Sequence, residues 1–251
     1  MGVEEELLQK RFIELSGKCE MGGYFTFSDF LGLSEQSVFA SCKGKLRSKF
    51  SLFGGADGCE RVMVRFGDAE ELGYEEPFPI KILKISPKSE KFAEKLTHRD
   101  YLGAILNLGI ERRELGDIAI CDKTAYLFAT EKISDYILSS LERIRHTDGV
   151  VTDVEKMPEI ELFRTERIKV QAVGERVDAI IAKVFKLSRD DASKLFAKGL
   201  VFISGKETQN TSTNLKCGDT VSVRGYGRFI YRGFSGLSKK GKLNIEIDLY
   251  I

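Results

Sequence analysis

Residues 176–206 read RVDAIIAKVFKLSRDDASKLFAKGLVFISGK, and this stretch predicts two short helices followed by a strand. An apolar stripe at helical spacing indicates the first helix, formed by Val177, Ile180, Ile181, Val184 and Phe185. Ser188 suits the N-cap of the second helix, with Asp191 three residues on in a variant of the capping box. Gly199 suits the end of that helix, and the alternation over residues 201–204 predicts the strand.

The cations of this stretch lie outside its apolar stripes, and we expect most of them to point into solvent. They are Arg176, Lys183, Lys186, Arg189, Lys194, Lys198 and Lys206. Basic side chains gathered on a small helical unit are typical of a surface that binds a polyanion.

Short motifs in a fixed order extend this unit. They are RVD at residues 176–178, SRDDA at 188–192, AKGLVFISGK at 197–206 and CGDTVSV at 217–223. Over residues 167–228 this order resembles the S-four RNA-binding domain, named after a protein of the small ribosomal subunit. The resemblance implies two helices against a small bent sheet, with the basic helix face docked on structured RNA. The chain departs from the pattern at Ser204, where many members have Asn, and at Asp190, which adds a negative charge near the expected RNA face.

The resemblance adds Ser188 and Arg228 to the cations above as expected RNA-binding residues. The charge distribution is consistent with this expectation. Residues 167–251 contain 16 Lys and Arg against 8 Asp and Glu, a net charge of +8, whereas residues 1–166 contain 23 against 30, a net charge of −7. This asymmetry predicts one polyanion-binding end and one end with another task. The alternative interpretation is an uneven surface without functional meaning.

Residues 1–76 are predicted to form a small N-terminal α/β domain. Helical spacing predicts a helix over residues 3–15 that stops near Gly17, and Ser34 is expected to cap a second helix that ends near Arg47. A strand is expected over residues 61–66. The glycines of the preceding GGADG segment predict a plain turn, because the segment lacks the G-K-[ST] of a phosphate-binding loop.

Residues 77–165 predict the β-α-β-β-α-β order of a ferredoxin-like or RNA-recognition-type domain that binds RNA. The expected strands are residues 80–86, 117–121, 125–130 and 149–154, and the expected helices are residues 98–108, capped by Thr97, and 133–144. Residues 166–251 form the third predicted domain, the S-four-type domain with its C-terminal strands. The chain as a whole is therefore predicted to be α+β.

Tyr126 and Phe128 lie on one face of an expected strand in this central domain, where aromatic rings stack on bases in RNA-recognition folds. The first strand carries no aromatic residue, and the R/K-G-F/Y-G/A-F signature is absent. We therefore favour Tyr126 and Phe128 as core or partner-facing residues.

Further motifs outside the S-four stretch carry a wider resemblance. They are GGADGCER at residues 54–61, HRDYLGAILNLGI at 98–110, ERRELGDI at 111–118 and GRF at 227–229. Together they resemble the YlmH family of bacterial S-four-domain RNA-binding proteins over nearly the whole chain, apart from the first 50 residues. The resemblance implies a non-enzymatic, cytoplasmic protein that binds rRNA or tRNA. It implies action on large ribosomal subunits that carry a stalled peptidyl-tRNA, in quality control that adds tails to the nascent chain.

Arg99, Arg112 and Arg113 lie in these motifs and are candidates for contact with RNA phosphate or a protein partner. An equal alternative for Arg99 is an ion pair with a carboxylate such as Asp100 or Asp117.

No cofactor or metal site is expected. The cysteines at 19, 42, 59, 121 and 217 are scattered without a C-x-x-C pair, and we expect buried free thiols. His98 and His146 are the histidines of the chain, and both suit surface or capping roles. The spelling His98-Arg99-Asp100 is similar to a kinase catalytic loop, but Asn107 lies too far along and no glycine-rich ATP loop is present.

Two other functions remain open at this point. One is an RNA-modifying enzyme, such as a pseudouridine synthase, that uses an S-four domain to dock on rRNA or tRNA. The other is an adaptor whose acidic N-terminal part binds a protein partner. We expect no membrane association, because the sequence shows neither a signal peptide nor an apolar run of about 18 residues.

Overall fold

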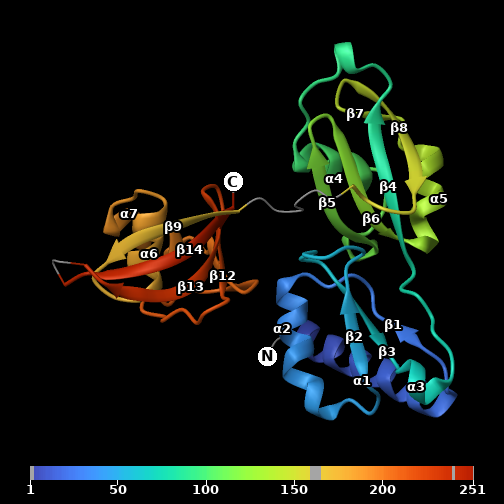
Figure 1. Ribbon diagram of the computed structural model, residues 1–251, viewed down its shortest axis with the longest axis horizontal. Coiled ribbons are helices and arrows are strands. Elements are labelled where there is room, and N and C mark those ends of the chain that lie inside the picture. The colour runs from blue at the N-terminus through green and yellow to red at the C-terminus, as the bar shows by residue number, and fades with distance from the viewer. Residues whose placement is uncertain (1–2, 159–164, 239–240, 251) are drawn as a thin grey trace. The chain divides into compact units, whose positions relative to one another are not determined.

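The computed structural model describes residues 3–158, 165–238 and 241–250 and divides the chain into two compact units, residues 1–162 and 163–251 (Figure 1). Both units combine helices with antiparallel sheets, so the predicted α+β class is confirmed. The first two predicted domains fall within the first unit, and the division into three domains stays a prediction. None of the helices in the described part of the chain combines the length and apolar character needed to cross a bilayer.

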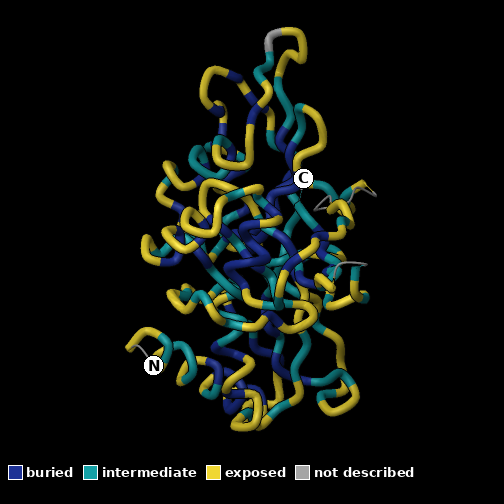
Figure 2. The backbone as a smooth tube through the Cα atoms, turned by 90° about the vertical axis from the view of Figure 1, so that its left-hand side faces the viewer, coloured by how far each residue is buried: buried dark blue, intermediate teal, exposed yellow. Residues whose placement is uncertain are grey.

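The first part of the first unit contains a three-stranded sheet with its helices. Its elements are α1 (Val3–Gly22), β1 (Thr26–Phe27), α2 (Leu33–Cys42), a 3-10 turn (Lys43–Lys45), β2 (Phe50–Phe53), β3 (Met63–Phe66) and α3 (Ala69–Leu72). The strands are antiparallel in the order β1-β3-β2. Phe39 occupies the core, where its ring meets the rings of Phe12, Phe50 and Phe66 edge to face. The first turns of α1 are largely exposed (Figure 2).

Two helix boundaries differ from the sequence prediction. α1 does not stop near Gly17, because Gly17 is buried in the interior of a helix that packs on the core along its length. α2 begins after Gly32, whose N–H donates to the Glu35 side chain, and Ser34 is not its cap. The helix ends at Cys42, earlier than predicted, because the chain tightens into the 3-10 turn.

The second part of the first unit is a five-stranded antiparallel sheet in the order β5-β6-β4-β8-β7. Its elements are β4 (Ile80–Pro87), a 3-10 turn (Glu90–Phe92), α4 (His98–Leu106), a 3-10 turn (Arg112–Glu114), β5 (Leu115–Cys121), β6 (Thr124–Thr130), α5 (Glu131–Ser140), β7 (Arg143–Ile144) and β8 (Thr147–Val154). Both helices cover one face of the sheet, since Ile105 of α4 and Ile137 of α5 share a core with Leu83, Ile85 and Leu127. The predicted β-α-β-β-α-β order is present, with β7 added.

The predicted helix over residues 133–144 is wrong at its end. α5 stops at Ser140, and residues 143–144 form a strand that pairs with residues 147–148 across a tight turn. The apolar spacing alone continued into this segment, but the pairing of β7 with β8 gives its backbone groups better partners. The predicted Thr97 cap of α4 is confirmed, because Asp100 accepts hydrogen bonds from both the N–H and the hydroxyl of Thr97.

Tyr126 and Phe128 lie on the sheet face opposite α4 and α5, and both are buried. Phe128 packs with Phe30 and Met63 from the first part of the unit. Gly55 makes this packing possible, since its φ is +104° and a Cβ there would lie 2.3 Å from the Phe128 ring. The preference for Tyr126 and Phe128 as core residues is confirmed, and GGADG is the turn that was predicted.

The second unit is a six-stranded antiparallel sheet with two helices on one face. Its elements are β9 (Thr165–Ala172), α6 (Val177–Val184), α7 (Arg189–Ala197), β10 (Val201–Ile203), β11 (Lys206–Glu207), β12 (Thr220–Val223), β13 (Gly227–Leu237) and β14 (Leu243–Tyr250). The strand order is β11-β10-β12-β13-β14-β9. A single core joins Ile180 of α6 and Phe196 of α7 to Phe229, Tyr231 and Ile247 of the strands. The two helices and the strand predicted over residues 176–204 are confirmed.

Candidate nucleic-acid interface

α6 is almost entirely buried and offers few side chains to a ligand. Lys183 is exposed on it, while the other residues from Val177 to Val184 are buried. Arg176 caps the start of α6, and its guanidinium donates to both oxygens of the buried Asp178 carboxylate at 3.0 and 3.1 Å. Arg176 is exposed, yet its side chain is anchored to the fold.

The α6–α7 turn holds a lysine in an unusual backbone conformation. Leu187 N–H donates to Ala182 O at 2.8 Å, the long bond of a Schellman motif that ends α6. Lys186 then occupies the position where Gly is usual, with φ of +54°. The same motif ends α7, where Leu200 N–H donates to Leu195 O and Gly199 has φ of +64°. The predicted end of α7 is thus confirmed.

α7 starts as the sequence predicts. Ser188 Oγ accepts a hydrogen bond from Asp191 N and donates to the Asp191 carboxylate at 2.6 Å. These bonds, together with an ion pair from Lys194, hold the pKa of Asp191 below its usual value. The Ser188 hydroxyl is therefore occupied by capping, which argues against its predicted role in RNA contact.

The cations of α7 are exposed but do not form one line. Because each residue turns an α-helix by about 100°, Arg189 and Lys198 point about 180° apart around α7, and Lys194 lies between them on the exposed side. Ala192, Leu195 and Phe196 occupy the buried side. The basic residues thus lie on both flanks of the exposed side of α7, which we call the α7 ridge. We define the α6–α7 surface by its exposed cations: Lys183, Lys186, Arg189, Lys194 and Lys198.

Lys206 lies apart from the α7 ridge, on β11 at one edge of the sheet. The hairpin that carries it turns through Ser204 and Gly205, both at positive φ, the geometry of a type I′ turn. Ser204, the departure from the S-four pattern, donates through its hydroxyl to the Asp219 carboxylate at 3.1 Å. The turn with Ser204 in place of the usual Asn therefore still has a polar contact, through the Ser204 hydroxyl.

Arg228 is not part of the helical surface. It alternates with the core residue Phe229 and so lies on the sheet face opposite the helices, half-buried against the ring of Tyr250. Burial lowers the pKa of Arg228 from its usual value. Arg228 therefore does not share a surface with the cations of α7, and its contact with RNA stays a prediction.

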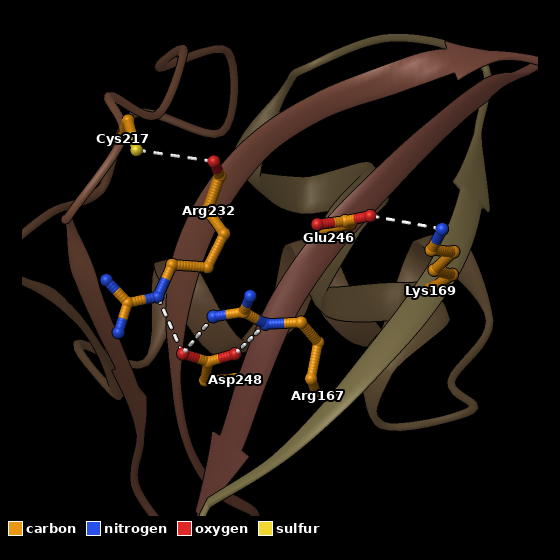
Figure 3. Close-up of polar contacts among 6 residues, drawn as sticks. All are labelled: Arg167, Lys169, Cys217, Arg232, Glu246 and Asp248. Atoms are coloured by element: carbon orange, nitrogen blue, oxygen red, sulfur yellow. Dashed lines mark hydrogen bonds and ion pairs between the residues drawn. The ribbon is translucent and has the colours of Figure 1, made fainter.

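The open sheet face carries further charged residues that the sequence interpretation missed (Figure 3). Asp248 accepts from Arg167 at 2.7 Å and from Arg232 at 2.6 Å, and the hydrogen bond from Arg167 is the main cause of its lowered pKa. Lys169 lies 3.1 Å from Glu246. The signal was present in TERIKVQA, residues 165–172, where polar and apolar residues alternate. Carboxylates compensate much of this positive charge.

The arginines of the central motifs have different environments. Arg99 on α4 and Arg113 are exposed, and Arg113 lies 2.8 Å from Glu111. Arg112 donates to the carbonyl oxygens of Leu115 and Gly116, and burial lowers its pKa to about 10. Arg112 therefore belongs to the interior hydrogen bonding of the unit, and the structure argues against its predicted contact with RNA.

The expected partners of Arg99 are engaged elsewhere. Asp100 lies 3.4 Å from Arg145. Asp117 is buried and accepts from the N–H groups of Glu60 and Arg61 at 2.6 and 3.0 Å. Neither carboxylate is recorded in an ion pair with Arg99, so the alternative of a local ion pair is not supported.

Asp117 and Arg61 connect the two sheets of the first unit through hydrogen bonds, and we call this contact the joint. The Arg61 side chain donates to the carbonyl oxygens of Leu115, Phe30 and Arg112 at 2.8–3.2 Å. Residues 54–61 and 111–118, two of the motifs behind the YlmH resemblance, thus meet at this joint. The residues of these two motifs therefore make contacts inside the fold, and their spacing in the sequence did not reveal these contacts.

The described residues contain no group of three or more His, Cys, Asp or Glu side chains placed to hold a metal ion. Cys19 and Cys42 are buried and Cys59 is half-buried, whereas Cys121 and Cys217 are exposed. The expectation of buried thiols is therefore wrong for these two. Both lie near strand ends, at the end of β5 and just before β12, where side chains reach solvent.

Residues 74–158 match the family model described as "Putative RNA-binding domain in YlmH". The chain is 23% identical over 251 residues to Ribosome-associated protein quality control protein P2 of Bacillus subtilis (strain 168), covering 98% of this chain and 93% of that protein. A solved structure, Cell division protein ylmH from Streptococcus pneumoniae, has a TM-score of 0.48 and 22% identity, covering 64% of this chain and 97% of the other. The family match and the full-length relative agree with the motifs described above. The chain thus resembles the YlmH family, by the family model over residues 74–158 and by a relative that aligns with nearly its whole length.

Proposed function

We propose that this protein binds structured RNA through the α6–α7 surface, as an S-four-type domain does, and that it performs no bond chemistry. The observation that carries the proposal is the set of exposed cations around one short helix pair, with Lys186 held in a backbone conformation that favours Gly. A residue kept in such a conformation against its preference points to a role for its side chain.

The shape of the surface suits a double-helical target. The α7 helix is about 13 Å long and has cations on both flanks of its exposed side. It is therefore able to lie between the two phosphate strands of a double helix, with cations directed toward each strand. The wide, shallow minor groove of A-form RNA presents such strands together with 2′-hydroxyls, and it is read mainly by shape. Asp190 lies between the two flanks of α7 and would face the groove, whereas Asp191 lies on the flank of Lys194, with which it forms an ion pair.

The comparisons support the choice of RNA as partner. The match over residues 74–158 is to a domain described as RNA-binding, and the relative from Bacillus subtilis is named for ribosome-associated quality control. We therefore propose rRNA of the large ribosomal subunit, tRNA, or both, as the target, on subunits that carry a stalled peptidyl-tRNA in the cytoplasm. The proposed role needs no cofactor.

Charge reversal at two exposed positions tests the proposal. We expect Arg189→Glu with Lys194→Glu to abolish sedimentation with large subunits and binding to an RNA hairpin, because each loses a phosphate contact and adds repulsion. Lys10→Glu with Lys45→Glu makes the same change in net charge at exposed positions of the first unit and is the matched control. The folded state of all variants is checked by circular dichroism.

The proposal fails if the α7 variant sediments with large subunits as the unchanged protein does. The RNA-modification alternative has its own readout, a mass change in unmodified rRNA or tRNA after incubation with the protein. A modified nucleoside would overturn the statement that no bond chemistry occurs.

A further inference from the structure

The central sheet does not offer aromatic rings to RNA bases. Phe128 is fully buried and Tyr126 is 8% exposed, because the first part of the unit covers this face around Phe128. An RNA contact within residues 74–158 must therefore use another surface, and base stacking on these two strand residues is excluded.

An open cleft of about 580 Å³ lies beside α4, near its packing against β7. Three arginines line it: Arg99 from α4, Arg143 from β7 and Arg145 from the turn between β7 and β8. Guanidinium groups carry planar donors that match phosphate oxygens, and they keep their charge at any physiological pH. The lining is therefore suited to an anion with several acceptor oxygens.

Two carboxylates lie in the cleft lining beside the three arginines. Asp100 accepts from Thr97 N–H at 2.8 Å and from the Thr97 hydroxyl at 2.7 Å, so it serves the start of α4. Glu142 is the other carboxylate of the lining. Arg99 is exposed and forms no ion pair within the described ranges of the chain. Three positive and two negative side chains line the cleft, and the carboxylate of Asp148 outside the lining lies 3.7 Å from Arg143.

The ion pairs at the rim leave their guanidinium groups accessible. Arg145 lies 3.4 Å from Asp100 and Arg143 lies 3.7 Å from Asp148, and the arginine side chains are 57% and 60% exposed. Exposed pairs of this length contribute little and are screened by salt. A phosphate group is able to contact the same guanidinium groups from the solvent side.

Two backbone features of the cleft point to a ligand. Arg145 has φ of +52°, a conformation that Gly or Asn adopts at lower cost, yet an arginine stands there. Gly103 lies in the middle of α4, where glycine disfavours a helix, and a Cβ at this position would meet nothing within 4 Å. Packing therefore does not require this glycine, whereas a ligand in the cleft would use the open space.

We infer that this cleft binds a phosphate group of an RNA backbone, as a second contact in addition to that of the α6–α7 surface. The inference rests on the proposed RNA-binding function and extends it to the central part of the first unit. Arg99 and Arg143 supply the main donors, Arg145 orders the rim, and Gly103 leaves room for the phosphate.

Binding of the full-length chain to an RNA hairpin at several salt concentrations tests the inference. We expect Arg99→Gln with Arg143→Gln to weaken binding about ten-fold at moderate salt. The steepness of log K against log salt should fall by about 0.7–0.9, because one phosphate contact is lost. Lys45→Gln with Lys132→Gln removes the same charge from exposed positions of the same unit outside the cleft, and should leave both quantities nearly unchanged.

Gly103→Ala separates the role of the cleft from charge and stability. The added methyl group favours the helix and narrows the cleft, so the melting temperature should not fall while RNA binding weakens. Unchanged affinity and slope in the Arg99/Arg143 variant, together with loss of binding in the α7 variant, would overturn this inference alone.

Two further outcomes are informative. If the unchanged protein binds no RNA hairpin and no large subunit, both the inference and the proposed function fail. If the cleft variant keeps RNA binding but loses large-subunit association, the cleft contacts protein rather than phosphate, and the inference is wrong.

Discussion

Two arginines of the first unit, Arg61 and Arg112, point into the joint between its sheets, whereas cations of α6 and α7 in the C-terminal unit are exposed to solvent. Arg61 and Arg112 donate to backbone carbonyl oxygens, and burial lowers the pKa of both. Lys183, Lys186 and Arg189 of the C-terminal unit are exposed. The same residue types therefore stabilise the fold in one region and are available to a partner in the other.

This difference shows that a basic residue does not have to contact a ligand merely because it belongs to a recognisable motif. The net charges of −7 and +8 for residues 1–166 and 167–251 show which end of the chain carries the excess of cations but cannot assign single side chains. What decides the role is whether acceptors lie within hydrogen-bond distance inside the fold. Arg112 has two such acceptors, and Lys186 projects from a turn.

The largest expected effect is on stability at the joint. Arg61→Ala should lower the free energy of unfolding by about 3 kcal/mol, because three carbonyl oxygens lose a donor in a half-buried site. Urea denaturation of the full chain, followed by the transition of the first unit, measures this. Arg113→Ala, an exposed neighbour, should change the same quantity by less than about 0.5 kcal/mol. Similar losses in both variants would remove the distinction between inward and displayed arginines.

An intermediate effect is expected at the two helix ends that share one motif. Lys186→Gly should raise stability by up to about 1 kcal/mol, because it relieves a left-handed conformation, and should weaken RNA binding about three- to ten-fold. Gly199→Ala should lower stability by about 1 kcal/mol, since its Cβ would lie 2.9 Å from the Glu207 carboxylate at φ of +64°. Thermal unfolding and hairpin binding are measured on both. A Lys186→Gly variant that binds RNA as before would show that the lysine is not displayed for a ligand.

The smallest expected effect is a pH dependence on the open sheet face. The pKa of Asp248 is lowered, first by its hydrogen bond with Arg167, so the pair stabilises the fold above the ordinary Asp pKa of about 3.9 and is lost as pH falls through the lowered value. Between about pH 5 and pH 2 the unchanged protein should lose less than about 1 kcal/mol relative to Asp248→Asn. The test is to measure the urea midpoints of the two proteins over this pH range. Parallel curves of midpoint against pH would contradict the stabilising role of the Asp248–Arg167 pair.

Several elements were predictable because their signals are local. The apolar stripe of α6, the Ser188 and Thr97 caps and Gly199 depend on residues within one or two turns, and all are present in the structure. The end of α5 was not predictable, because residues 143–144 are held by pairing with β8 rather than by their own propensity. Gly17 likewise looked like a stop, but packing carries α1 through it.

The candidate site was predictable in composition and only partly in arrangement. The exposed cations of residues 183–198 follow from helical periodicity, since the apolar faces were known. The sequence did not show that Arg228 lies on the sheet face opposite the helices, because a single residue in a strand gives no indication of which face its neighbours will share. The cleft of Arg99, Arg143 and Arg145 joins residues from two elements that only tertiary packing brings together.

The amino-acid sequence alone established the α+β class, the basic C-terminal end, the helix pair of residues 176–199 and the resemblance to the YlmH family. Helix caps, periodicity, charge and motifs carried these conclusions, because each of them depends on residues close together in the sequence. Three-dimensional packing was needed to bury Phe128, to draw Arg61, Arg112 and Asp117 into a joint, and to separate Arg228 from α7. The physical reason is that burial and hydrogen-bond partners depend on which distant segments pack together, and periodicity along the chain does not specify these contacts.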